Sequence, residues 1–364
     1  MSRRFDIAIV GAGMAGASLA AAIGEAASAV LLEAETHPGY HSTGRSAAFW
    51  SESYGGPLVQ PLTTASEAFL RENGFLRPRG GLHIADAGGE GALEALRAEH
   101  GGKVRLEPLD RGALEAMVPG LRPGWSAGIY EPTCTDIDVA GLHAFYLAAA
   151  KRAGAVLLTD AALHAARRED GVWRLDTAAG PVEADVLVNA AGAWADAVAL
   201  LAGVRPLGIQ SYRRTVAQLR VDPPAPADLP LVMDARETFY FKPEAGGRIW
   251  LSPQDETPCE AADCAAEELD VAIAIDRLEK VVDWKVLRVE RAWAGLRSFA
   301  PDRLPVYGFD PHVPGFFWCA GQGGFGIQTA PAGADLAAAL LLEQEAVGAA
   351  AGLDPFPYRP ERFG

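Results

Sequence analysis

The chain has 364 residues, of which 49% are hydrophobic, and its 32 Lys and Arg against 47 Asp and Glu give a formal net charge of −15. The length exceeds that of a usual single domain and the apolar fraction is that of a globular protein, so we expect two ordered domains sharing a large core. The acidic balance argues against nucleic acid as a partner, since phosphate binding needs a basic surface, and it offers no polybasic segment to anionic lipid.

The cysteine pattern predicts neither a disulfide framework nor a metal site. Cys259 and Cys264 are separated by four residues, but no second pair and no histidine cluster accompanies them. Cys134 and Cys319 stand alone in the sequence. We therefore expect reduced thiols, buried or incidental, and no bound metal.

The N-terminal segment combines Arg3 and Arg4 with an apolar stretch over residues 7–32, which by hydropathy resembles a signal peptide or a membrane segment. Glu25 interrupts this stretch, and three glycines punctuate it at a spacing that a cleaved segment does not need. We interpret the region as mature structure. No other apolar run approaches a membrane span, so we expect a soluble, cytoplasmic protein without a transmembrane segment.

The first 34 residues predict a strand, a glycine-rich turn, a helix and a second strand. Residues 5–10 are nearly all apolar, as in a buried parallel strand, the helix runs to about residue 27, and the second strand, 29–32, ends in Glu33. The three glycines permit a tight turn, close approach to a pyrophosphate, and helix–strand packing, while Glu33 can bond ribose hydroxyls. A merely structural glycine turn does not explain Glu33. The predicted dinucleotide-binding residues here are Gly11, Ala12, Gly13, Met14, Ala15, Gly16, Glu33 and Ala34.

The rest of the chain alternates helices and strands and closes with a second glycine-rich junction. Expected helices are 57–72, 90–98 and 142–153, and expected strands include 156–158, 173–175 and 186–190. Asp196 is expected to cap the helix that follows residue 194. Between about 206 and 290, alternating polar and apolar residues favour a mainly antiparallel sheet. Because residues 321–329 again lead from a strand into a helix, we predict one nucleotide-binding domain made of distant segments, with the antiparallel part inserted.

Five motifs in this order resemble a known family. They are GAGMAG with Glu33, HSTGRSAA at 41–48, VLVNAAGAW at 186–194, WAGLRSF at 293–299 and GQGGFGIQT at 321–329. Over roughly residues 5–340 the chain resembles the FAD-dependent D-amino-acid dehydrogenase/oxidase superfamily, which includes glycine oxidase and sarcosine oxidase. Within it, the chain looks most like bacterial D-amino-acid dehydrogenases of the D-arginine dehydrogenase kind.

The resemblance implies an α/β fold with two domains. The first is a discontinuous, Rossmann-like FAD-binding domain of the glutathione-reductase type, and the second is a mainly antiparallel α+β substrate domain inserted into it. The expected FAD-binding segments are 1–78, 136–205 and 290–364, and the expected substrate-binding segments are 79–135 and 206–289.

The resemblance also implies an extended FAD whose adenosine half lies on the first glycine turn. Its ring system is expected near residues 45–48 and the loop 323–328, where backbone amides at a helix start stabilise the negative charge of reduced flavin. A nicotinamide enzyme has no obvious use for this second loop, and because WAGLRSF lacks a cysteine we expect non-covalent FAD. The further expected cofactor-binding residues are Gly44, Arg45, Ser46, Ala47, Ala48, Ala191, Gly192, Trp194, Arg297, Gly323, Gly324, Phe325, Gly326, Ile327 and Gln328.

Arg297 is the leading candidate for substrate binding. It lies between two flavin segments, where a cation is costly unless it meets an anion, and a guanidinium fork suits an α-carboxylate. The alternative is a structural ion pair. The resemblance assigns Arg214 as a second carboxylate-binding arginine, with a solvated strand edge as its alternative.

The resemblance assigns supporting roles to further residues. Tyr54 and Tyr240 match tyrosines that donate to the carboxylate or cover the pocket, although rim aromatics are an alternative for both. The Gly324 carbonyl is expected to accept from the substrate amine. Ser51 is expected near the flavin N5.

Two departures from the arginine-preferring relatives bear on the substrate. Phe49 stands where they place a histidine, and Gly81 stands near the position of an acidic residue. Without that acid a cationic side chain is not recognised, so we expect a pocket of Phe49, Trp50 and Leu82 for apolar or aromatic side chains. His83 is either a polar pocket group or a paired strand histidine, and Trp50 is alternatively core.

The expected reaction is oxidative deamination of a D-amino acid. Hydride leaves Cα for flavin N5 once the amine is neutral, and the imino acid hydrolyses to a 2-oxo acid and ammonia; positioning supplies most of the acceleration. Oxidation of a secondary amine such as sarcosine, or of a 2-hydroxy acid, remains an alternative. So does a non-catalytic binding protein on the same fold, similar to prenyl-GTPase escort proteins. The electron acceptor, oxygen or a quinone, and the oligomeric state stay open.

Overall fold

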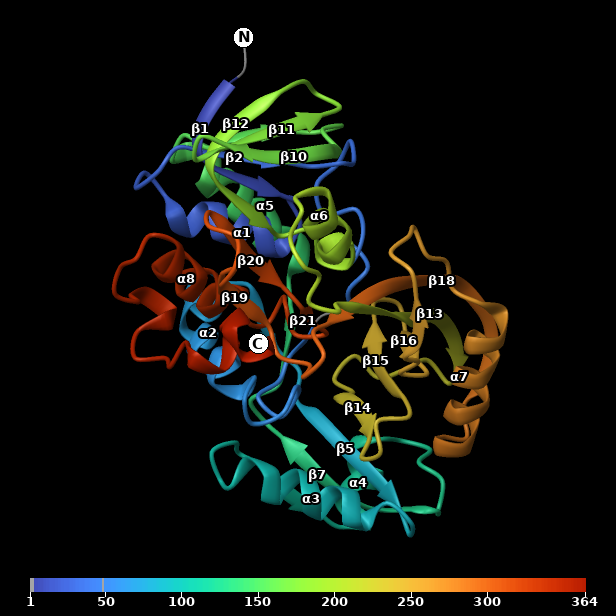
Figure 1. Cartoon of the computed structure of the whole chain (residues 1–364). Coiled ribbons are helices and arrows are strands. Elements are labelled where there is room, and N and C mark those ends of the chain that lie inside the picture. Colours follow the sequence, from blue (N-terminus) through green and yellow to red (C-terminus); the bar gives the residue numbers. More distant parts are fainter. Residues whose placement is uncertain (1–2, 48) are drawn as a thin grey trace.

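Two large β-sheets organise the molecule, whose computed structural model describes residues 3–47 and 49–364 (Figure 1). The first sheet has the order β10-β11-β12-β1-β2-β9, with β20 beside β12 and β19 beside β20. Its strands are β1 (Arg3–Val10), β2 (Ala29–Leu32), β9 (Val156–Leu158), β10 (Leu163–Glu169), β11 (Val172–Thr177), β12 (Val182–Asn189), β19 (Val306–Phe309) and β20 (Phe316–Ala320). The strands β9, β2, β1, β12 and β20 are parallel to their neighbours in this run.

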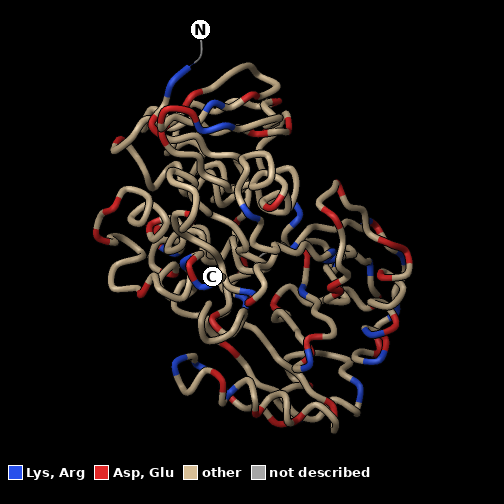
Figure 2. The backbone as a smooth tube through the Cα atoms, viewed as in Figure 1, with Lys and Arg blue, Asp and Glu red and all other residues tan. Residues whose placement is uncertain are grey.

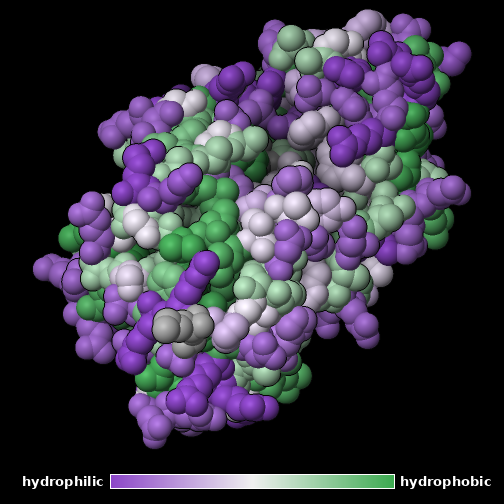
Figure 3. Space-filling view, turned by 90° about the horizontal axis from the view of Figure 1, so that it is seen from above, coloured by the Kyte–Doolittle hydropathy of each residue, from purple (hydrophilic) through white to green (hydrophobic). Residues whose placement is uncertain are grey.

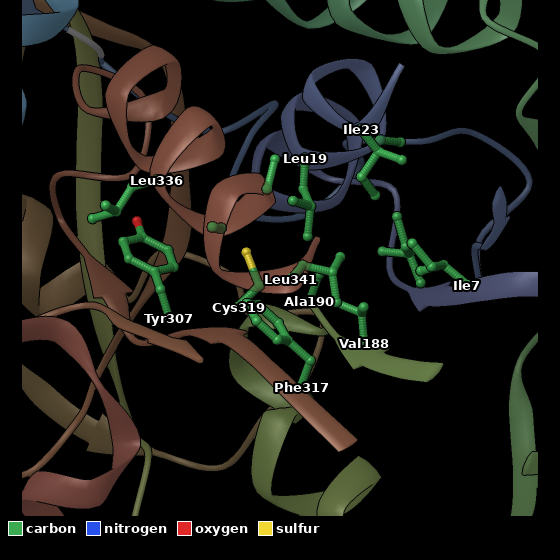
Figure 4. Packing of buried hydrophobic residues seen from close by; sticks show 14 of the residues in the cluster. Ile7, Leu19, Ile23, Val188, Ala190, Tyr307, Phe317, Cys319, Leu336 and Leu341 are labelled. Carbon is green, nitrogen blue, oxygen red and sulfur yellow. The ribbon is translucent and has the colours of Figure 1, made fainter. Parts of the chain in front are cut away.

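Alternate residues of β1 enter different cores, which explains why its second half reads as continuously apolar. Ile7 and Ile9 pack with the helices on one face, whereas Ala8 and Val10 pack with β10, β11 and α6 on the other. Figure 4 shows the first of these cores, in which side chains from both ends of the chain, including Leu19 of the first helix and Leu336 of the last, face the strands.

The helices surround the sheets. They are α1 (Met14–Ile23), α2 (Gln60–Glu72), α3 (Glu90–His100), α4 (Arg111–Met117), α5 (Val139–Arg152), α6 (Ala195–Leu201), α7 (Glu268–Val281) and α8 (Ala330–Leu341), with 3-10 helices at Gly192–Trp194, Gly348–Ala350, Phe356–Tyr358 and Pro360–Phe363. Helix α1 is shorter than predicted because Gly24, in a positive-φ conformation (φ 58°), ends it before residue 27.

The second sheet is mainly antiparallel and has the order β21-β18-β13-β16-β15-β14-β5-β7-β6, with β17 beside β13. Its strands are β5 (Gly81–Asp86), β6 (Glu107–Leu109), β7 (Trp125–Glu131), β13 (Gln210–Asp222), β14 (Leu231–Asp234), β15 (Tyr240–Glu244), β16 (Arg248–Ser252), β17 (Thr257–Cys259), β18 (Lys285–Phe299) and β21 (Gln322–Gly323). The β14–β5 pair is parallel. Helix α7 covers one face, where Leu278 packs among strand residues such as Phe241 and Leu251.

The two sheets meet at the C-terminal glycine loop. Strand β20 belongs to the first sheet, and β21, which begins two residues after β20 ends, pairs with β18 of the second. A small sheet of β3 (Phe49–Trp50), β8 (Thr135–Ile137) and β4 (Leu76–Pro78) lies apart from both. The predicted fold class of a Rossmann-like domain with a mainly antiparallel second domain is confirmed. The predicted domain boundaries stay a prediction, and residue 290 falls inside β18.

Asp196 does not cap the helix that follows residue 194, contrary to the sequence-based expectation. It lies in the first turn of α6 and accepts hydrogen bonds from the backbone amides of Leu207, Gly208 and Ile209 (2.8–3.2 Å). Its carboxylate therefore holds the segment that leads into β13, and burial raises its pKa although those amides oppose the rise.

Charged positions lie mainly along the periphery of the molecule, with acidic and basic residues interspersed on α3 and α7 (Figure 2). The face in Figure 3 is mostly hydrophilic, with smaller hydrophobic areas between the polar ones. All four cysteines are free thiols, and Cys134 and Cys319 are buried. Among the described residues, no helix has the length and hydropathy that a membrane crossing requires.

Candidate active site

A pocket of about 450 Å³ lies where the parallel strands of the first sheet end. Segments that follow β1, β2, β12 and β20 all contribute to its wall, which is the usual place for a ligand in an open parallel sheet. Residues from the first glycine turn and from the C-terminal loop therefore line one cavity. The predicted residues that line it are Gly11, Gly13, Met14, Ala15, Glu33, Ala34, Ser46, Ala191, Gly192, Trp194, Arg297, Gly323, Gly324, Gly326 and Ile327.

The first glycine turn needs its glycines for separate reasons. Gly11 has φ 99°, and a Cβ there would lie 2.6 Å from the Ala190 carbonyl oxygen. A Cβ on Gly16 would overlap with the Gly11 carbonyl, so Gly16 serves helix–strand packing and does not line the pocket. The Met14 amide, at the start of α1, donates to Thr43 Oγ1 at 3.0 Å.

Glu33 directly follows β2 and lies almost fully buried at the pocket wall. It accepts from the amides of Ala12 (2.9 Å) and Glu35 (3.0 Å). These two bonds fix the carboxylate, and a carboxylate has about four acceptor positions, so capacity remains for hydroxyl donors. Ala12 itself is fully buried and acts through this backbone bond.

His41, further along the pocket wall, has one ring nitrogen that is paired and one that is not paired among the described residues. Nε2 of His41 lies 2.9 Å from Glu35 Oε1, whereas its Nδ1 is buried without a hydrogen-bond partner among the described residues. The imidazole packs against the Trp194 ring with centroids 4.5 Å apart. An unpaired buried nitrogen beside an aromatic ring suits a ligand that has both polar atoms and a flat apolar part.

The C-terminal glycine loop connects this pocket to the second sheet. Gly323 has φ 56°, a conformation that favours glycine. Gln328 reaches from the loop to the segment around residue 51: its Nε2 donates to the Tyr54 carbonyl (3.1 Å) and to Thr63 Oγ1 (2.9 Å), and its Oε1 accepts from the Ser51 amide (3.2 Å). Gln328 thus fixes the position of Tyr54 relative to the loop.

A smaller cavity of about 20 Å³ adjoins the large pocket and shares Ser46, Arg297, Gly324 and Ile327 with it. Its other lining residues are Ala47, Phe49, Tyr54, Arg214, Tyr240, Gln254 and Gln328. The cavity therefore brings together both predicted arginines and both predicted tyrosines, which come from the segment after β3 and from β13, β15 and β18.

Arg297 is a buried cation at the junction of the two cavities. Only 9% of its surface is exposed, and no ion pair involving it occurs among residues 3–47 and 49–364. Among the described residues, the guanidinium donates a hydrogen bond to the Leu296 carbonyl at 3.5 Å. Burial lowers its pKa, although the neighbouring Tyr54 acts in the opposite direction. The structural ion pair considered from sequence is therefore not formed, and the guanidinium lines both cavities.

Arg214 is buried rather than solvated, which removes the strand-edge alternative. Its Nε donates to the Asp255 carbonyl (2.9 Å) and its Nη2 pairs with Glu256 (3.0 Å). Burial acts to lower its pKa, but the net shift is upward because Tyr54, Tyr240 and Glu256 favour the cation. The carboxylate of Glu256 thus balances the positive charge of Arg214, whereas no carboxylate among the described residues pairs with Arg297.

Aromatic rings enclose the small cavity. Phe49 packs 5.3 Å from Tyr54 and 6.0 Å from Tyr240, measured between ring centroids, and Tyr54 packs 5.1 Å from Phe325. Tyr240 is 4% exposed, and burial raises its pKa while Arg297 and Arg214 lower it. Tyr240 therefore remains a protonated donor at neutral pH.

Comparison with known proteins decides the family. Residues 6–340 match the family described as FAD dependent oxidoreductase. The chain belongs to this family. Its structure superposes on glycine oxidase from Geobacillus kaustophilus with a TM-score of 0.84 at 23% identity, covering 98% of each chain. Glycine oxidase from that organism is 27% identical to it in sequence over 367 residues, or 95% of both chains.

Other relatives are much longer than the part that matches. FAD-dependent oxidoreductase domain-containing protein 1 from Bos taurus is 30% identical over 179 residues, covering 45% of this chain and 37% of that protein. Mitochondrial dimethylglycine dehydrogenase from Mus musculus is 27% identical over 225 residues, covering 55% of this chain and 25% of that enzyme. The chain thus spans about a quarter to a third of these two relatives.

As a member of the FAD dependent oxidoreductase family, the protein uses FAD, as predicted. The large pocket fits this cofactor because it joins the glycine turn, the spare acceptor capacity of Glu33 and the unpaired His41 Nδ1 to the C-terminal loop. Ala48, one of the cofactor-binding residues expected from sequence, lies outside the described residues. That the FAD is non-covalent stays a prediction.

Several predicted residues lie away from both cavities. The Arg45 guanidinium binds Asp263 and the carbonyls of Cys264 (2.8 Å) and Ala294 (3.3 Å), so it ties the pocket loop to another segment instead of facing the ligand. Gly44 belongs to a turn in which its amide donates to Gly39 at 2.7 Å.

Ser51 and Phe325 also lie behind the pocket walls. Ser51 is fully buried, donates to Glu131 at 2.8 Å and is not among the residues that line either cavity, so its expected place near the flavin N5 stays a prediction. Phe325 packs with Val59 and Phe299 and supports the loop from outside.

The pocket expected around Phe49 differs in two members. Trp50 is fully buried core, with its Nε1 donating to the Thr63 carbonyl (2.9 Å), and Leu82 is core of the second sheet. His83 is a paired strand histidine, 3.2 Å from Ser53 Oγ. Phe49 itself lines the small cavity as predicted.

Three of the lining residues that sequence reasoning missed have polar side chains that bear on ligand binding. Thr43 and His41 lie in the HSTGRSAA motif but carried no individual role, and Gln254 lies in a segment without a recognisable motif. Only the fold brings Gln254 next to Arg297.

Proposed function

We propose that the protein oxidises a small α-amino acid, glycine or a D-amino acid with a short side chain, to the imino acid, which hydrolyses in water to a 2-oxo acid and ammonia. The observation that carries this proposal is the buried guanidinium of Arg297 at the junction of the two cavities, for which the described residues supply no anionic partner. A buried cation is costly unless an anion meets it, and an α-carboxylate supplies that anion in a geometry that the guanidinium fork matches.

The residues around Arg297 would orient the substrate. Tyr54 and Tyr240 can donate to the carboxylate, and Arg214 adds positive potential even though Glu256 already pairs with it. The Gly324 carbonyl can accept from the amine and favour the placement of Cα over the large pocket. Bound FAD would supply the chemistry, acceptance of two electrons and a hydrogen from Cα. The protein contributes binding and orientation, which are major sources of acceleration in such a reaction.

The size of the small cavity supports a short side chain. Its volume of about 20 Å³ is close to the space that a single water needs. The rings of Phe49, Tyr54 and Tyr240 bound it, so the apolar wall predicted from Phe49 is present, but an aromatic substrate side chain would require those rings to move. The preference expected from sequence, for a substrate with an apolar or aromatic side chain, thus narrows to a substrate with a small apolar side chain. Selection of the D-enantiomer rests on the family resemblance.

Oxidation of a secondary amine is the second candidate. The dimethylglycine dehydrogenase among the relatives acts, by its name, on an N-methylated amino acid, and such a substrate presents the same carboxylate to Arg297. Sarcosine differs from glycine by one N-methyl group, so substrate comparison separates the two candidates directly.

Anaerobic bleaching of the flavin tests this function. Purified protein loaded with FAD is mixed without oxygen with glycine, D-alanine, L-alanine, sarcosine, D-phenylalanine and D-arginine, and air is then admitted. We expect rapid loss of flavin absorbance with glycine or D-alanine, and slower loss with D-phenylalanine and D-arginine. Faster bleaching by sarcosine would favour the second candidate. No bleaching by any amine, or no uptake of FAD, would overturn the proposal, and recolouring in air would identify oxygen as an acceptor.

A further inference from the structure

Gln254 lines the small cavity and carries a buried acceptor that has no partner among the described residues. Its Oε1 is buried and has no hydrogen-bond partner among the residues that the structure describes. Buried amide oxygens in folded proteins are nearly always paired, so an unpaired one in a cavity indicates a partner that binds there. Gln254 lines the same cavity as Arg297 and Gly324.

The backbone holds Gln254 rigidly in this place. Its φ is 48°, a left-handed conformation that is uncommon for residues other than glycine. The backbone amide of Gln254 donates to Ser252 Oγ at 3.1 Å. On the other side, the backbone carbonyl of Asp255 accepts from Arg214 Nε at 2.9 Å. The Asp255 carboxylate accepts from the Thr215 amide and hydroxyl, which anchors the turn to β13. The backbone at Gln254 is thus held by contacts on both flanks.

The nearby protein donors do not serve this oxygen. Arg214 directs its guanidinium to Asp255 and Glu256, and the protein bond of Arg297 goes to the Leu296 carbonyl. Since these two guanidinium groups are directed elsewhere, a bound ligand is the source of a partner that we consider for Gln254 Oε1. A small amino acid with its carboxylate ionised has hydrogen-bond donors only on its nitrogen.

From this juxtaposition we propose that Gln254 is a specificity-determining residue whose amide oxygen accepts a hydrogen bond from the substrate amine. The proposal rests on the proposed function. A neutral primary amine has two N–H donors, one for the Gly324 carbonyl and one for Gln254 Oε1. An N-methylated amine has one donor fewer and leaves one of these acceptors unpaired. Gln254 thereby favours primary over secondary amines, and the substrate class it selects is small primary α-amino acids.

Three variants separate the acceptor from the bulk of this side chain. Gln254→Met keeps an unbranched side chain of similar length and removes the acceptor, whereas Gln254→Glu keeps an acceptor oxygen. Gln344→Leu, at an exposed position remote from the cavities, controls for loss of a glutamine in general. Each FAD-loaded variant is compared with the wild type in anaerobic flavin reduction by two matched pairs, glycine with sarcosine and D-alanine with N-methyl-D-alanine.

The measured quantity is the ratio of specificity constants for primary and N-methylated substrate. We expect Gln254→Met to lower this ratio by about tenfold, which corresponds to the loss of one hydrogen bond, while Gln254→Glu and Gln344→Leu preserve it. The charge that Glu introduces affects both members of a pair alike, because they share the carboxylate. An unchanged ratio in Gln254→Met overturns the proposal, and so does an equal fall in Gln254→Met and Gln254→Glu, which would show a response to shape. Failure of the proposed function itself is seen separately, in wild-type flavin that no amine reduces.

Discussion

The hydroxyl of Tyr54 occupies the space that a side chain on Gly324 would need. A Cβ built on Gly324 would overlap with the Tyr54 hydroxyl oxygen. The two residues come from opposite ends of the chain, and Gln328 further binds the Tyr54 carbonyl (3.1 Å). The absence of a side chain at Gly324 is therefore what allows the aromatic wall of the small cavity to close on the C-terminal loop.

Replacement of Gly324 by alanine tests this contact. The methyl group would push the Tyr54 hydroxyl away from the cavity, and displacement of a positioning group by about 1 Å is worth up to about 100-fold in rate. We expect Gly324→Ala to lower kcat/KM for glycine or D-alanine by about that factor. Gly124→Ala, where a Cβ meets no atom within 4 Å, serves as the control. Equal activity in the two variants would show that Tyr54 can move without cost.

Phe49 should set the upper size limit of the substrate. Truncation in Phe49→Ala removes a ring from the wall of the 20 Å³ cavity and makes room for a longer side chain. We expect flavin reduction by D-leucine or D-phenylalanine, relative to D-alanine, to increase by about tenfold or more. Phe356→Ala, at a position 74% exposed, should leave the ratio unchanged. A ratio that stays constant in Phe49→Ala would place the side-chain pocket elsewhere.

Glu131 holds the segment that carries Tyr54. This fully buried carboxylate accepts from the hydroxyls of Ser51 (2.8 Å) and Ser53 (2.5 Å) and from the Glu52 amide (2.7 Å). Glu131→Ala removes the carboxylate that accepts from three buried donors, and we expect a loss of about 3 kcal/mol in the free energy of unfolding.

Denaturant unfolding of the FAD-loaded protein measures this loss. Glu131→Gln keeps acceptor capacity on one oxygen and should lose less, and Glu94→Ala, at an exposed position on α3, should be close to wild type. If the alanine variant at 131 were as stable as that at 94, the carboxylate would not hold the segment.

His83 should make stability depend on pH. Burial, with a smaller effect of His100, lowers its pKa from 6.5 to about 4. Between these values the unfolded chain binds a proton that the folded chain does not. The free energy of unfolding therefore falls, by up to about 3 kcal/mol, as pH decreases from about 6.5 to about 4. Above pH 6.5 the imidazole is neutral in both states and no longer lowers the free energy of unfolding. His83→Gln should flatten the dependence in this window, whereas exposed His37→Gln should not. An unaltered slope in His83→Gln would assign the effect to other groups.

The glycine turn and the alternation of the inserted sheet were predictable because their constraints are local. Gly11 is required by its own φ and by the backbone next to it. The end of α1 at Gly24 was missed because the alanine-rich sequence beyond it favours helix by propensity alone.

The roles of Ser51, Arg45 and Gln254 depend on distant partners. Ser51 turns toward Glu131, 80 residues away, and Arg45 toward Asp263, 218 residues away. No local pattern distinguishes a serine that faces a ligand from one that satisfies a buried carboxylate. Gln254 differs again, since its significance lies in a hydrogen bond that the folded protein leaves unmade.

Carboxylate binding by Arg297 is measured most directly by the substrate dependence of anaerobic flavin reduction in Arg297→Met. The matched control is Arg236→Met, which removes a partly exposed arginine that pairs with Asp86. We expect Arg297→Met to retain FAD and to raise the apparent Kd for glycine or D-alanine by about 100-fold or more, as for loss of a buried ion pair, with Arg236→Met unchanged. An apparent Kd in Arg297→Met equal to that of the wild type would contradict the assignment of this guanidinium as the substrate anchor.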